Sequence, residues 1–559
     1  METADNNVII FAFYRPTFFI FCVSSFRVIL QEKENTQKFL FPQENTCQTP
    51  ENTPHLCITV LRKGWIIMTH IKGFIIAGGV FLLMLHAGAL SAGRTMNILV
   101  YPFSSSGAPG HEWISAGMTD TVISDLNRVR GINVFSDDDR KKAVRELELS
   151  MTGIIRDRDI PKVGQIMGAN LIFTGSYSVS GDRIRVIAKL MRVGSSTVEK
   201  SIKLDDTMNN IFGLQDRIVT GLMSAAKDLD FTGYTEPDYR KKEWSKGKPT
   251  PQPGLQAFEL YARGLQISEQ NPKGALEYIN KALKKSPRYV EALIQGAWVY
   301  GILGENRKAL QYYSKAKTIL TRKRLHTSYL FAQVLANTGI IQWNLHQYHN
   351  ALRDYERAIA IMKRTGKTNT GTYASTLTNT GSAYRSLGDH DKALAFTLRG
   401  KKKWESMGLK FTSGYAWTLS NLGVVYYTKA DYEKSLACYR DANRVWEQIG
   451  LMNSPGYAMT SGQIGYIYNS RGDYSNALKY LKKGTGISER LGTGNTETHA
   501  WYLWYIASIY TDHKKNPCVA VPYMKKSVNI FRNINHREYP RAEGYLNTIS
   551  SACNAQRKK

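Results

Sequence analysis

The sequence has 559 residues, a formal net charge of +28, 43% hydrophobic residues and 11% aromatic residues. A chain of this length exceeds what one hydrophobic core serves, so a single-domain protein is excluded and two or more domains are expected. The positive charge indicates either a polyanionic partner or a diffuse spread of Lys and Arg over helical faces. Because no basic run is interleaved with stacking aromatics, the sequence argues against a nucleic-acid partner.

Residues 1–67 are a doubtful leader. The apolar stretch from Val8 to Ile29 is broken by Arg15, Pro16 and Arg27, and neither a helical nor a strand period is sustained. We expect this segment to be disordered or not translated.

Residues 68–92 have the layout of a secretory signal peptide. Met68 to Lys72 is a short basic start, Phe74 to Leu90 is a run of 17 mostly apolar residues, and small residues precede Ala92. The alternative is a transmembrane anchor, but the run is shorter than the roughly 20 residues that a span needs. No lipobox cysteine follows the run, which implies export without a lipid anchor. The predicted location is therefore the periplasm or cell envelope, with an inner-membrane anchor as the alternative.

Residues 93–231 predict an α/β domain, because the hydrophobic period changes between strand and helix types. The expected order is a strand, a helix, a strand, a short helix, three strands and a closing helix. The corresponding ranges are 97–103, 113–126, 132–135, 161–168, 170–177, 183–191, 197–204 and 209–222.

Several sequence segments of this domain resemble the TolB amino-terminal-type domain, which is also seen in FlgO-like and CsgG-like envelope proteins. The segments are Ile98–Phe103, Ser115–Leu126, Gly168–Tyr177, Gly181–Val186 and Ile211–Asp216. They occupy core and turn positions for the most part. The resemblance therefore implies a fold and an envelope setting, and no activity.

Two stretches of this domain carry side chains that also occur in ligand sites. Ser104 to Gly107 precedes a helix, but the GxxxxGK[ST] pattern and its lysine are missing, so we interpret the stretch as an ordinary βα loop. Asp137 to Asp139 could bind a divalent cation, but we interpret these residues as the acidic start of a helix. We expect neither a cofactor nor a metal here.

Residues 232–254 predict a semi-stiff linker. Pro237, Pro249, Pro251 and Pro253 lie among charged residues, and no hydrophobic period is present. We expect the two halves of the chain to move relative to each other.

Three cysteines lie beyond the leader, namely Cys438, Cys518 and Cys553. We interpret Cys438 as a buried thiol, because it precedes a predicted packing position. The odd number and the lack of a paired spacing predict neither a metal site nor a disulfide framework.

From about Leu293 to Ser527, one pattern returns every 42 residues. Its first position is always small: Ala297, Gly339, Gly381, Gly423, Gly465 and Ala507. Twelve residues later comes a second column, small in all but the last unit; four further on comes a column dominated by tyrosine, and three beyond that a third column of mostly small residues. This spacing predicts antiparallel helix pairs in which small residues permit close approach.

These positions resemble those of the tetratricopeptide repeat family. An earlier unit, Ala262 to Pro287, has the family's usual 34-residue offset to the next unit, and the 42-residue units are similar to the extended subtype of kinesin light chain and related peptide-binding solenoids. The resemblance implies an all-α, right-handed solenoid of about seven helix pairs over residues 255–550, followed by a basic tail at 551–559. Val519 and Lys526 replace small residues in the last unit, which is typical of a degenerate cap.

An amide lies two residues before the small residue in five units. This column consists of Gln295, Asn337, Asn379, Asn421 and Gln463. The side chains at this offset point away from the helix-pair contact, and in the resembling family this face lines a concave groove. Amides can donate to and accept from the backbone of an extended peptide. The alternative is that they are solvated or brace neighbouring loops.

Two tryptophans are further candidates for contact with a peptide. Trp417 and Trp501 lie six residues before the small residues of their units, and Trp504 lies three before. Packing between long helices is the alternative for all three.

No set of catalytic side chains is visible. His346 and His349 have the spacing of a metal pair but lack a third ligand in register. Asp389 lies at a turn where later units also carry aspartate, so we interpret it as a turn or capping residue. The sequence therefore predicts a protein that is not an enzyme and that binds no cofactor.

The interpretation as a whole is an exported adaptor of the bacterial cell envelope that binds a protein or extended peptide in the groove of a helical solenoid. One alternative is a structural subunit that self-associates through its α/β domain. Another is a regulatory protein tethered to the inner membrane by Phe74 to Leu90. Contact with a membrane is expected only through this signal or anchor segment.

Overall fold

The computed structural model describes residues 8–13, 17–22, 96–107, 109–129, 132–135, 140, 159–226, 253–268 and 270–557. The chain divides into two compact units, residues 1–82 and 83–559, and each is described by itself. The proposed signal segment, residues 232–252 of the predicted linker, and Asp137 to Asp139 lie outside the described residues. None of the helices that the structure describes is long and apolar enough to cross a bilayer.

In the first unit, two strands form an antiparallel pair. They are β1 (Val8–Phe13) and β2 (Thr17–Cys22), with Val8 opposite Cys22. The sequence predicted no regular structure here. Both strands consist largely of β-branched and aromatic residues, which favour the extended conformation on either side of a turn.

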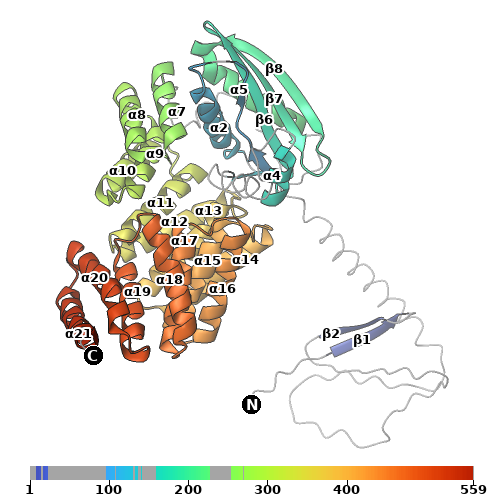
Figure 1. Cartoon of the computed structure of the whole chain (residues 1–559). Coiled ribbons are helices and arrows are strands. Elements are labelled where there is room, and N and C mark those ends of the chain that lie inside the picture. Colours follow the sequence, from blue (N-terminus) through green and yellow to red (C-terminus); the bar gives the residue numbers. More distant parts are fainter. Residues whose placement is uncertain are drawn as a thin grey trace, which may run out of the picture. The chain divides into compact units, whose positions relative to one another are not determined.

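The second unit begins with a mixed sheet (Figure 1). Its strands are β3 (Met96–Val100), β4 (Ser104–Ser105), β5 (Ile132–Val134), β6 (Leu171–Ser180), β7 (Arg183–Arg192) and β8 (Val198–Thr207). The order is β5-β3-β6-β7-β8, with β4 beside β6. Strands β5, β3 and β6 are parallel, whereas β6, β7 and β8 form the predicted antiparallel meander.

Helices cover both faces of this sheet. The helices are α2 (Trp113–Leu126), α4 (Ile160–Met167), the short 3₁₀ turn η2 (Met208–Asn210) and α5 (Ile211–Ala226). Because side chains alternate along a strand, Ile98 faces the core that contains α2 and α5, whereas its neighbour Leu99 faces α4. The α/β fold class predicted from the sequence is confirmed. Ser104 and Ser105, interpreted as loop residues, instead pair with β6 as the short strand β4.

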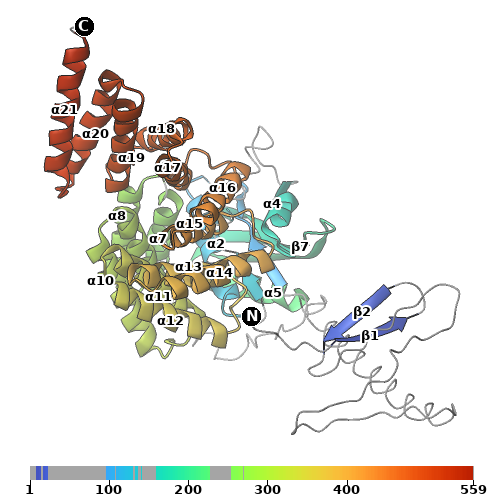
Figure 2. The same cartoon turned by 90° about the horizontal axis from the view of Figure 1, so that it is seen from below.

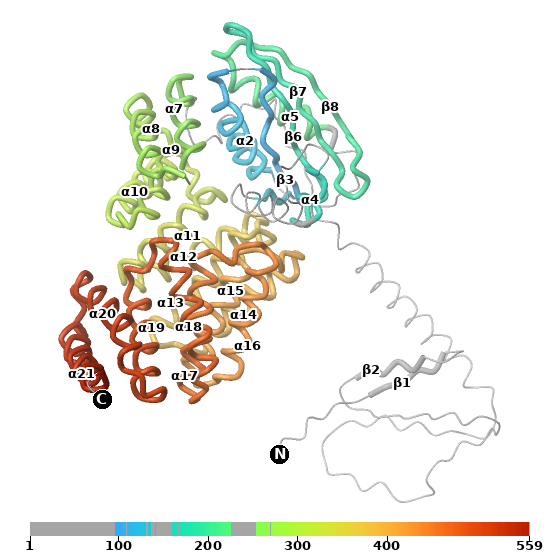
Figure 3. Tube along the Cα trace, viewed as in Figure 1, coloured from blue at the N-terminus to red at the C-terminus, as the bar shows by residue number. Residues whose placement is uncertain are grey.

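The remainder of the second unit is a solenoid of helices (Figure 3). The first helices of the pairs are α7 (Leu255–Ile267), α9 (Val290–Ile302), α11 (Tyr329–Asn344), α13 (Gly371–Ser386), α15 (Ser413–Thr428), α17 (Pro455–Ser470) and α19 (Glu497–Ser508). The second helices are α8 (Pro272–Lys285), α10 (Asn306–Arg322), α12 (Tyr348–Arg364), α14 (His390–Ser406), α16 (Tyr432–Gln448), α18 (Tyr474–Arg490) and α20 (Pro517–Asn533). A final helix, α21 (Tyr539–Arg557), follows α20.

The small-residue columns lie where the helices of each pair touch. A Cβ added to Gly381 in α13 would lie 2.3 Å from the Thr397 Oγ1 and 2.8 Å from the Ala393 carbonyl oxygen, both in α14. Only glycine allows this separation. Ala393, which belongs to the second column, and Tyr439, which belongs to the tyrosine column, are at most 1% exposed. The predicted helix pairs, in which small residues permit close approach, are therefore confirmed.

Helix caps repeat with the same period. Ser or Thr side chains cap the first helices by accepting a hydrogen bond from the backbone N–H three residues on. These caps are Ser328, Thr370, Thr412, Ser454 and Thr496. Asp389, Asp431 and Asp473 cap second helices in the same way, which confirms the capping interpretation of Asp389.

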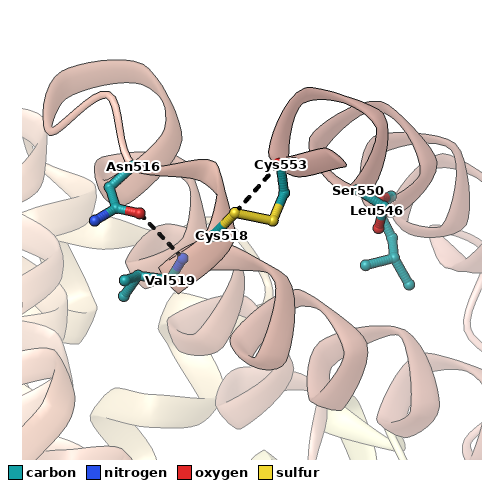
Figure 4. The surroundings of a disulfide bond; sticks show 6 residues. All are labelled: Asn516, Cys518, Val519, Leu546, Ser550 and Cys553. Carbon is teal, nitrogen blue, oxygen red and sulfur yellow. Dashed lines mark hydrogen bonds between the residues drawn. A yellow bond between two sulfur atoms is a disulfide. The ribbon is translucent and has the colours of Figure 1, made fainter. Parts of the chain in front are cut away.

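The last unit departs from the regular pattern. The π-helical segment η3 (Ile509–His513) follows α19, α20 contains Pro522, and Val519 is exposed. A disulfide joins Cys518 in the first turn of α20 to Cys553 near the end of α21 (Figure 4). The sequence prediction of no disulfide was wrong, because two cysteines 35 residues apart carry no local signal of pairing.

The solenoid packs against the α/β domain at its first pair. Phe258 of α7 lies edge-on to Trp113 of α2 and to Phe212 of α5, with ring centroids 5.8 Å and 4.9 Å away. The hydroxyl of Tyr261 in α7 donates a 2.8 Å hydrogen bond to Asp120 of α2. The sequence predicted halves that move relative to each other, whereas the structure joins them through a shared core.

A second contact between the two parts depends on a buried lysine. Lys367, in the loop between α12 and α13, is 3% exposed, and its Nζ donates to the backbone oxygens of Val129 and Ile132 at 2.9 Å and 2.8 Å. Burial lowers the pKa of Lys367 to about 7. Val129 precedes β5 and Ile132 is the first residue of this edge strand, so the solenoid holds this edge of the sheet.

Candidate functional site

The predicted amide column lies on one face of five consecutive first helices. Its side chains are all half-buried: Gln295 in α9, Asn337 in α11, Asn379 in α13, Asn421 in α15 and Gln463 in α17. Residues at spacings of three and four share a face of a helix. The column is therefore a line of amides that crosses one helix after another.

Two of these amides already bond within the chain. The Nδ2 of Asn421 donates to the Trp417 carbonyl at 3.0 Å, and its Oδ1 accepts from the Ser382 hydroxyl of α13 at 3.0 Å. Asn337 shares a hydrogen bond with Tyr313, which partly offsets the rise in the pKa of Tyr313 caused by burial. Asn421 and Asn337 thus bond to residues of helices α10, α13 and α15, and not to the neighbouring loops that the sequence left as an alternative.

The other three amides keep their capacity for hydrogen bonds. Within the described chain, the side chains of Gln295, Asn379 and Gln463 have no hydrogen-bond partner in the structure. Each such amide offers two donors and an acceptor. These three residues are therefore the members of the column that remain available to a ligand backbone.

Sequence reasoning missed a second column on this face. It lies three residues after the amides and contains Trp298, Ile340, Ser382, Val424 and Tyr466. Trp298 is 36% exposed and Ile340 is 39% exposed. The sequence could have indicated this column, because a spacing of three residues from the amides places its members on the same helical face. Exposed apolar groups therefore interleave with amides in α9 and α11.

The two predicted tryptophans differ in their surroundings. Trp417 is 40% exposed, and its ring lies edge-on to the buried Trp446 at 5.8 Å. Trp501 stacks on Trp504 at 5.3 Å and meets Phe531 of α20 edge-on at 5.3 Å. Trp417 thus presents an open aromatic surface on the amide face. Trp501 instead packs between helices, which was the alternative to peptide contact.

Three tyrosines extend the face toward the end of the solenoid. The hydroxyl of Tyr427 donates to that of Tyr466 at 3.0 Å, and the ring centroids of Tyr466 and Tyr505 lie 5.0 Å apart. Burial, followed by the hydrogen bond to Tyr466, raises the pKa of Tyr427. Burial also raises the pKa of Tyr505, so the hydroxyls of Tyr427 and Tyr505 stay neutral at physiological pH.

The groups considered for chemistry are separated from one another. His346 adopts a left-handed backbone at its turn, and its Nδ1 lies 2.6 Å from the Tyr348 hydroxyl. Burial raises the pKa of Cys438 to about 12, so this half-buried thiol stays protonated. In the part of the chain that the structure describes, no group of three His, Cys, Asp or Glu residues could hold a metal ion.

Comparison with protein families supports the repeat assignment. The sequence model of the tetratricopeptide repeat family matches residues 330–398 and 414–490. These ranges cover α11 to α14 and α15 to α18. The chain therefore contains tetratricopeptide repeats, a type of helical repeat that is typically a non-catalytic scaffold for protein interaction.

One curated relative is similar over part of the chain. It is described as a putative adenylate cyclase 3 of Rhizobium meliloti (strain 1021), and it is 24% identical over 196 residues. The match covers 34% of this chain and 30% of the relative. The chain thus matches less than a third of that protein's length, and the relative's name does not establish catalysis here.

Three solved structures are similar to parts of this chain. A Rap protein in complex with competence and sporulation factor is 12% identical, with a TM-score of 0.40 and coverage of 62% of this chain and 96% of that chain. BtubC from P. vanneervenii is 17% identical, with a TM-score of 0.33 and coverage of 41% and 92%. Kinesin light chain repeats of Podosopora anserina are 12% identical, with a TM-score of 0.31 and coverage of 38% and 98%.

Proposed function

We propose that this chain, whose helix pairs are tetratricopeptide repeats, is a non-enzymatic adaptor that holds an extended segment of a partner protein along its first helices. The observation that carries the proposal is the combination of two columns on one face. Gln295, Asn379 and Gln463 can bond to a peptide backbone, while Trp298 and Ile340 offer apolar area to its side chains. Such a face suits a chain that alternates backbone and side-chain contacts.

We further propose that the adaptor works in the bacterial cell envelope. Phe74 to Leu90 has the pattern of a signal segment, and the α/β domain has sequence segments similar to TolB amino-terminal-type domains. The disulfide between Cys518 and Cys553 is compatible with an oxidising compartment. These three independent features support export.

The amide face is tested with peptides selected from a random display library against the native chain. We expect the variant Asn379→Ala with Gln463→Ala to bind a selected peptide about tenfold more weakly, because two net hydrogen bonds of roughly 0.5–1.5 kcal/mol each are lost. Neither side chain braces the fold, so stability stays unchanged. Affinity is measured by fluorescence polarisation.

The matched control removes two exposed amides from second helices, Gln311→Ala with Asn529→Ala. It is expected to bind as the native chain does. Equal binding by both double variants would contradict the assignment of the amide face as the peptide-binding surface. Trp298→Ala then tests whether the apolar column contributes, with a further loss of affinity expected.

Export is tested by amino-terminal sequencing of the protein recovered from a cell-envelope fraction. We expect a start near Ala92, because small residues follow the apolar segment at the distance that signal peptidase requires. A start at Met68 with the segment intact would place the protein at the inner membrane instead. A start at Met1 would show that the leader is translated.

A further inference from the structure

Most of the positive charge on the helix pairs of the solenoid lies on the second helices. The seven second helices, α8 to α20, carry 28 Lys and Arg residues and nine Asp and Glu residues. The seven first helices, α7 to α19, carry two basic and three acidic residues. The excess charge is therefore separated from the amide face and lies on the outer layer of the helix pairs.

Part of this charge forms a column with the repeat period. One position before the third small residue, six units carry an exposed cation: Lys281, Lys315, Arg357, Arg399, Lys483 and Lys525. The spacing is 34 residues for the first step and a multiple of 42 for the others. Only α16 departs from the series, with Asp441 at the equivalent position. These six residues are called the cation column below.

Aromatic rings support the side chains of this column. Five of the six charged groups lie between 4.6 Å and 5.7 Å from a ring centroid, and the rings belong to Tyr278, Tyr312, Phe331, Phe396 and Tyr457. Contact with a ring restricts a long side chain while its head stays in water. The column thus presents partly ordered cations, which lowers the entropy that a ligand must overcome.

Almost none of the cations in this column forms an ion pair with a carboxylate. Among the described residues, only Lys483 has one within 4 Å, the Glu447 carboxylate at 3.9 Å. Neighbouring cations of the same helices behave differently, because Lys308, Lys392 and Lys434 each pair with the acidic residue three positions before. The helices therefore neutralise one column of cations and leave the other available.

A hollow of about 440 Å³ adjoins the column at α18. Lys482, Lys483 and Arg490 line it together with Asn453, and no carboxylate lines it. Gly486 forms part of its wall, whereas Lys402 and Arg444 occupy the equivalent positions of the two preceding units. Glycine leaves the space that a long side chain would fill, so three cationic residues meet an opening large enough for an anionic group.

We infer that the cation column binds inorganic polyphosphate, a flexible, linear polyanion with one phosphate group per monomer and no bases to stack, on a surface separate from the peptide face. Arg and Lys both bind phosphate, and the arginines can do so through two parallel hydrogen bonds. A linear chain fits better than an anionic membrane, because α10, α12, α14, α16 and α18 lie on successive sides of the solenoid (Figure 2). A flat surface touches only some of them, whereas a flexible chain follows them all. This inference does not depend on the proposed adaptor function.

Long-chain inorganic polyphosphate is the probe, and the full chain is titrated with it at several salt concentrations. The variant Lys315→Gln, Arg357→Gln, Arg399→Gln is expected to bind at least tenfold more weakly. The slope of log K against log salt concentration is expected to become less steep by about 2, because each lost contact with a single-stranded polyanion reduces the slope by roughly 0.7. All three side chains are exposed, so folding is unaffected.

The control has the same change in net charge on the same layer of helices. It is Lys308→Gln, Lys392→Gln, Lys434→Gln, which removes the cations that already have acidic partners. Binding within about twofold of the native chain supports the column. Equal losses in the two triple variants would show a non-specific charge effect and overturn the inference. Binding to phosphatidylglycerol vesicles but not to polyphosphate would overturn it as well.

A gain of function provides a second test. Asp441 interrupts the column and pairs with Arg444 at 2.8 Å. The variant Asp441→Lys completes the series from α8 to α20 and releases Arg444, so it should tighten polyphosphate binding severalfold and steepen the salt dependence. Unchanged binding by Asp441→Lys would contradict a continuous column.

Discussion

Replacing Lys367 with methionine will remove one contribution to the free energy of unfolding that increases as the pH rises from 7 to 10.5. The folded chain holds the pKa of this amine at about 7 because of burial, against 10.5 for a free side chain. Between these values the unfolded chain binds more protons than the folded one, so the free energy of unfolding increases with pH. Each pH unit in this window contributes about 1.4 kcal/mol.

The difference in the free energy of unfolding between the native chain and Lys367→Met is therefore about 2 kcal/mol larger at pH 9 than at pH 7, because the folded amine is already half neutral at pH 7. At high pH the neutral amine still donates to the carbonyl oxygens of Val129 and Ile132, which methionine cannot do. Below pH 7 the amine is charged in both states and the difference stays constant. Urea unfolding at a series of pH values measures this.

Lys363→Met serves as the control, because Lys363 is exposed and lies four residues away in α12. Its stability should follow that of the native chain with pH. Parallel curves for the native chain and Lys367→Met would show that the amine does not titrate in the window and would contradict the prediction.

The repeat architecture could be predicted because residues at short, periodic spacings in the sequence determine it. A small residue at Gly381 and another at Ala393 specify a close contact between adjacent helices, and the next unit repeats the information 42 residues later. The acid at Asp389 could be interpreted as a cap for the same reason. By contrast, Lys367 meets acceptors more than 230 residues away in the sequence. Nothing local to Lys367 indicates such a contact.

The candidate site was predicted in part for a related reason. Periodicity identified the amide column, but it could not separate Asn421, which bonds to Ser382, from Asn379, which has no such partner among the described residues. That distinction depends on the packing of neighbouring helices. Trp298 and Ile340 were accessible to the same argument and were missed, because apolar residues are usually assigned to the core.

The disulfide at the end of the solenoid is expected to make a large contribution to the stability of the last units. Replacing Cys518 and Cys553 with serine should destabilise the last units by about 4 kcal/mol, the chain-entropy value for a loop of this size, in which the bonded residues are 35 apart. Each repeat contacts only its neighbours, so the loss should concentrate in α20 and α21. Hydrogen exchange of α21 amides measures it, with Cys438→Ser as the control, since that thiol is unpaired.

Reduction of the native chain should reproduce the exchange pattern of the double serine variant, because both remove the same cross-link. If α21 exchanges equally fast in the oxidised native chain and in the variant, the bond does not stabilise the end of the solenoid. The same bond also reports on location, since cytosolic proteins keep their thiols reduced. Thiols blocked at the moment of cell lysis should therefore include Cys438 but neither Cys518 nor Cys553. Three blocked thiols would place the chain in a reducing compartment and argue against export, whatever the effect of the disulfide on stability.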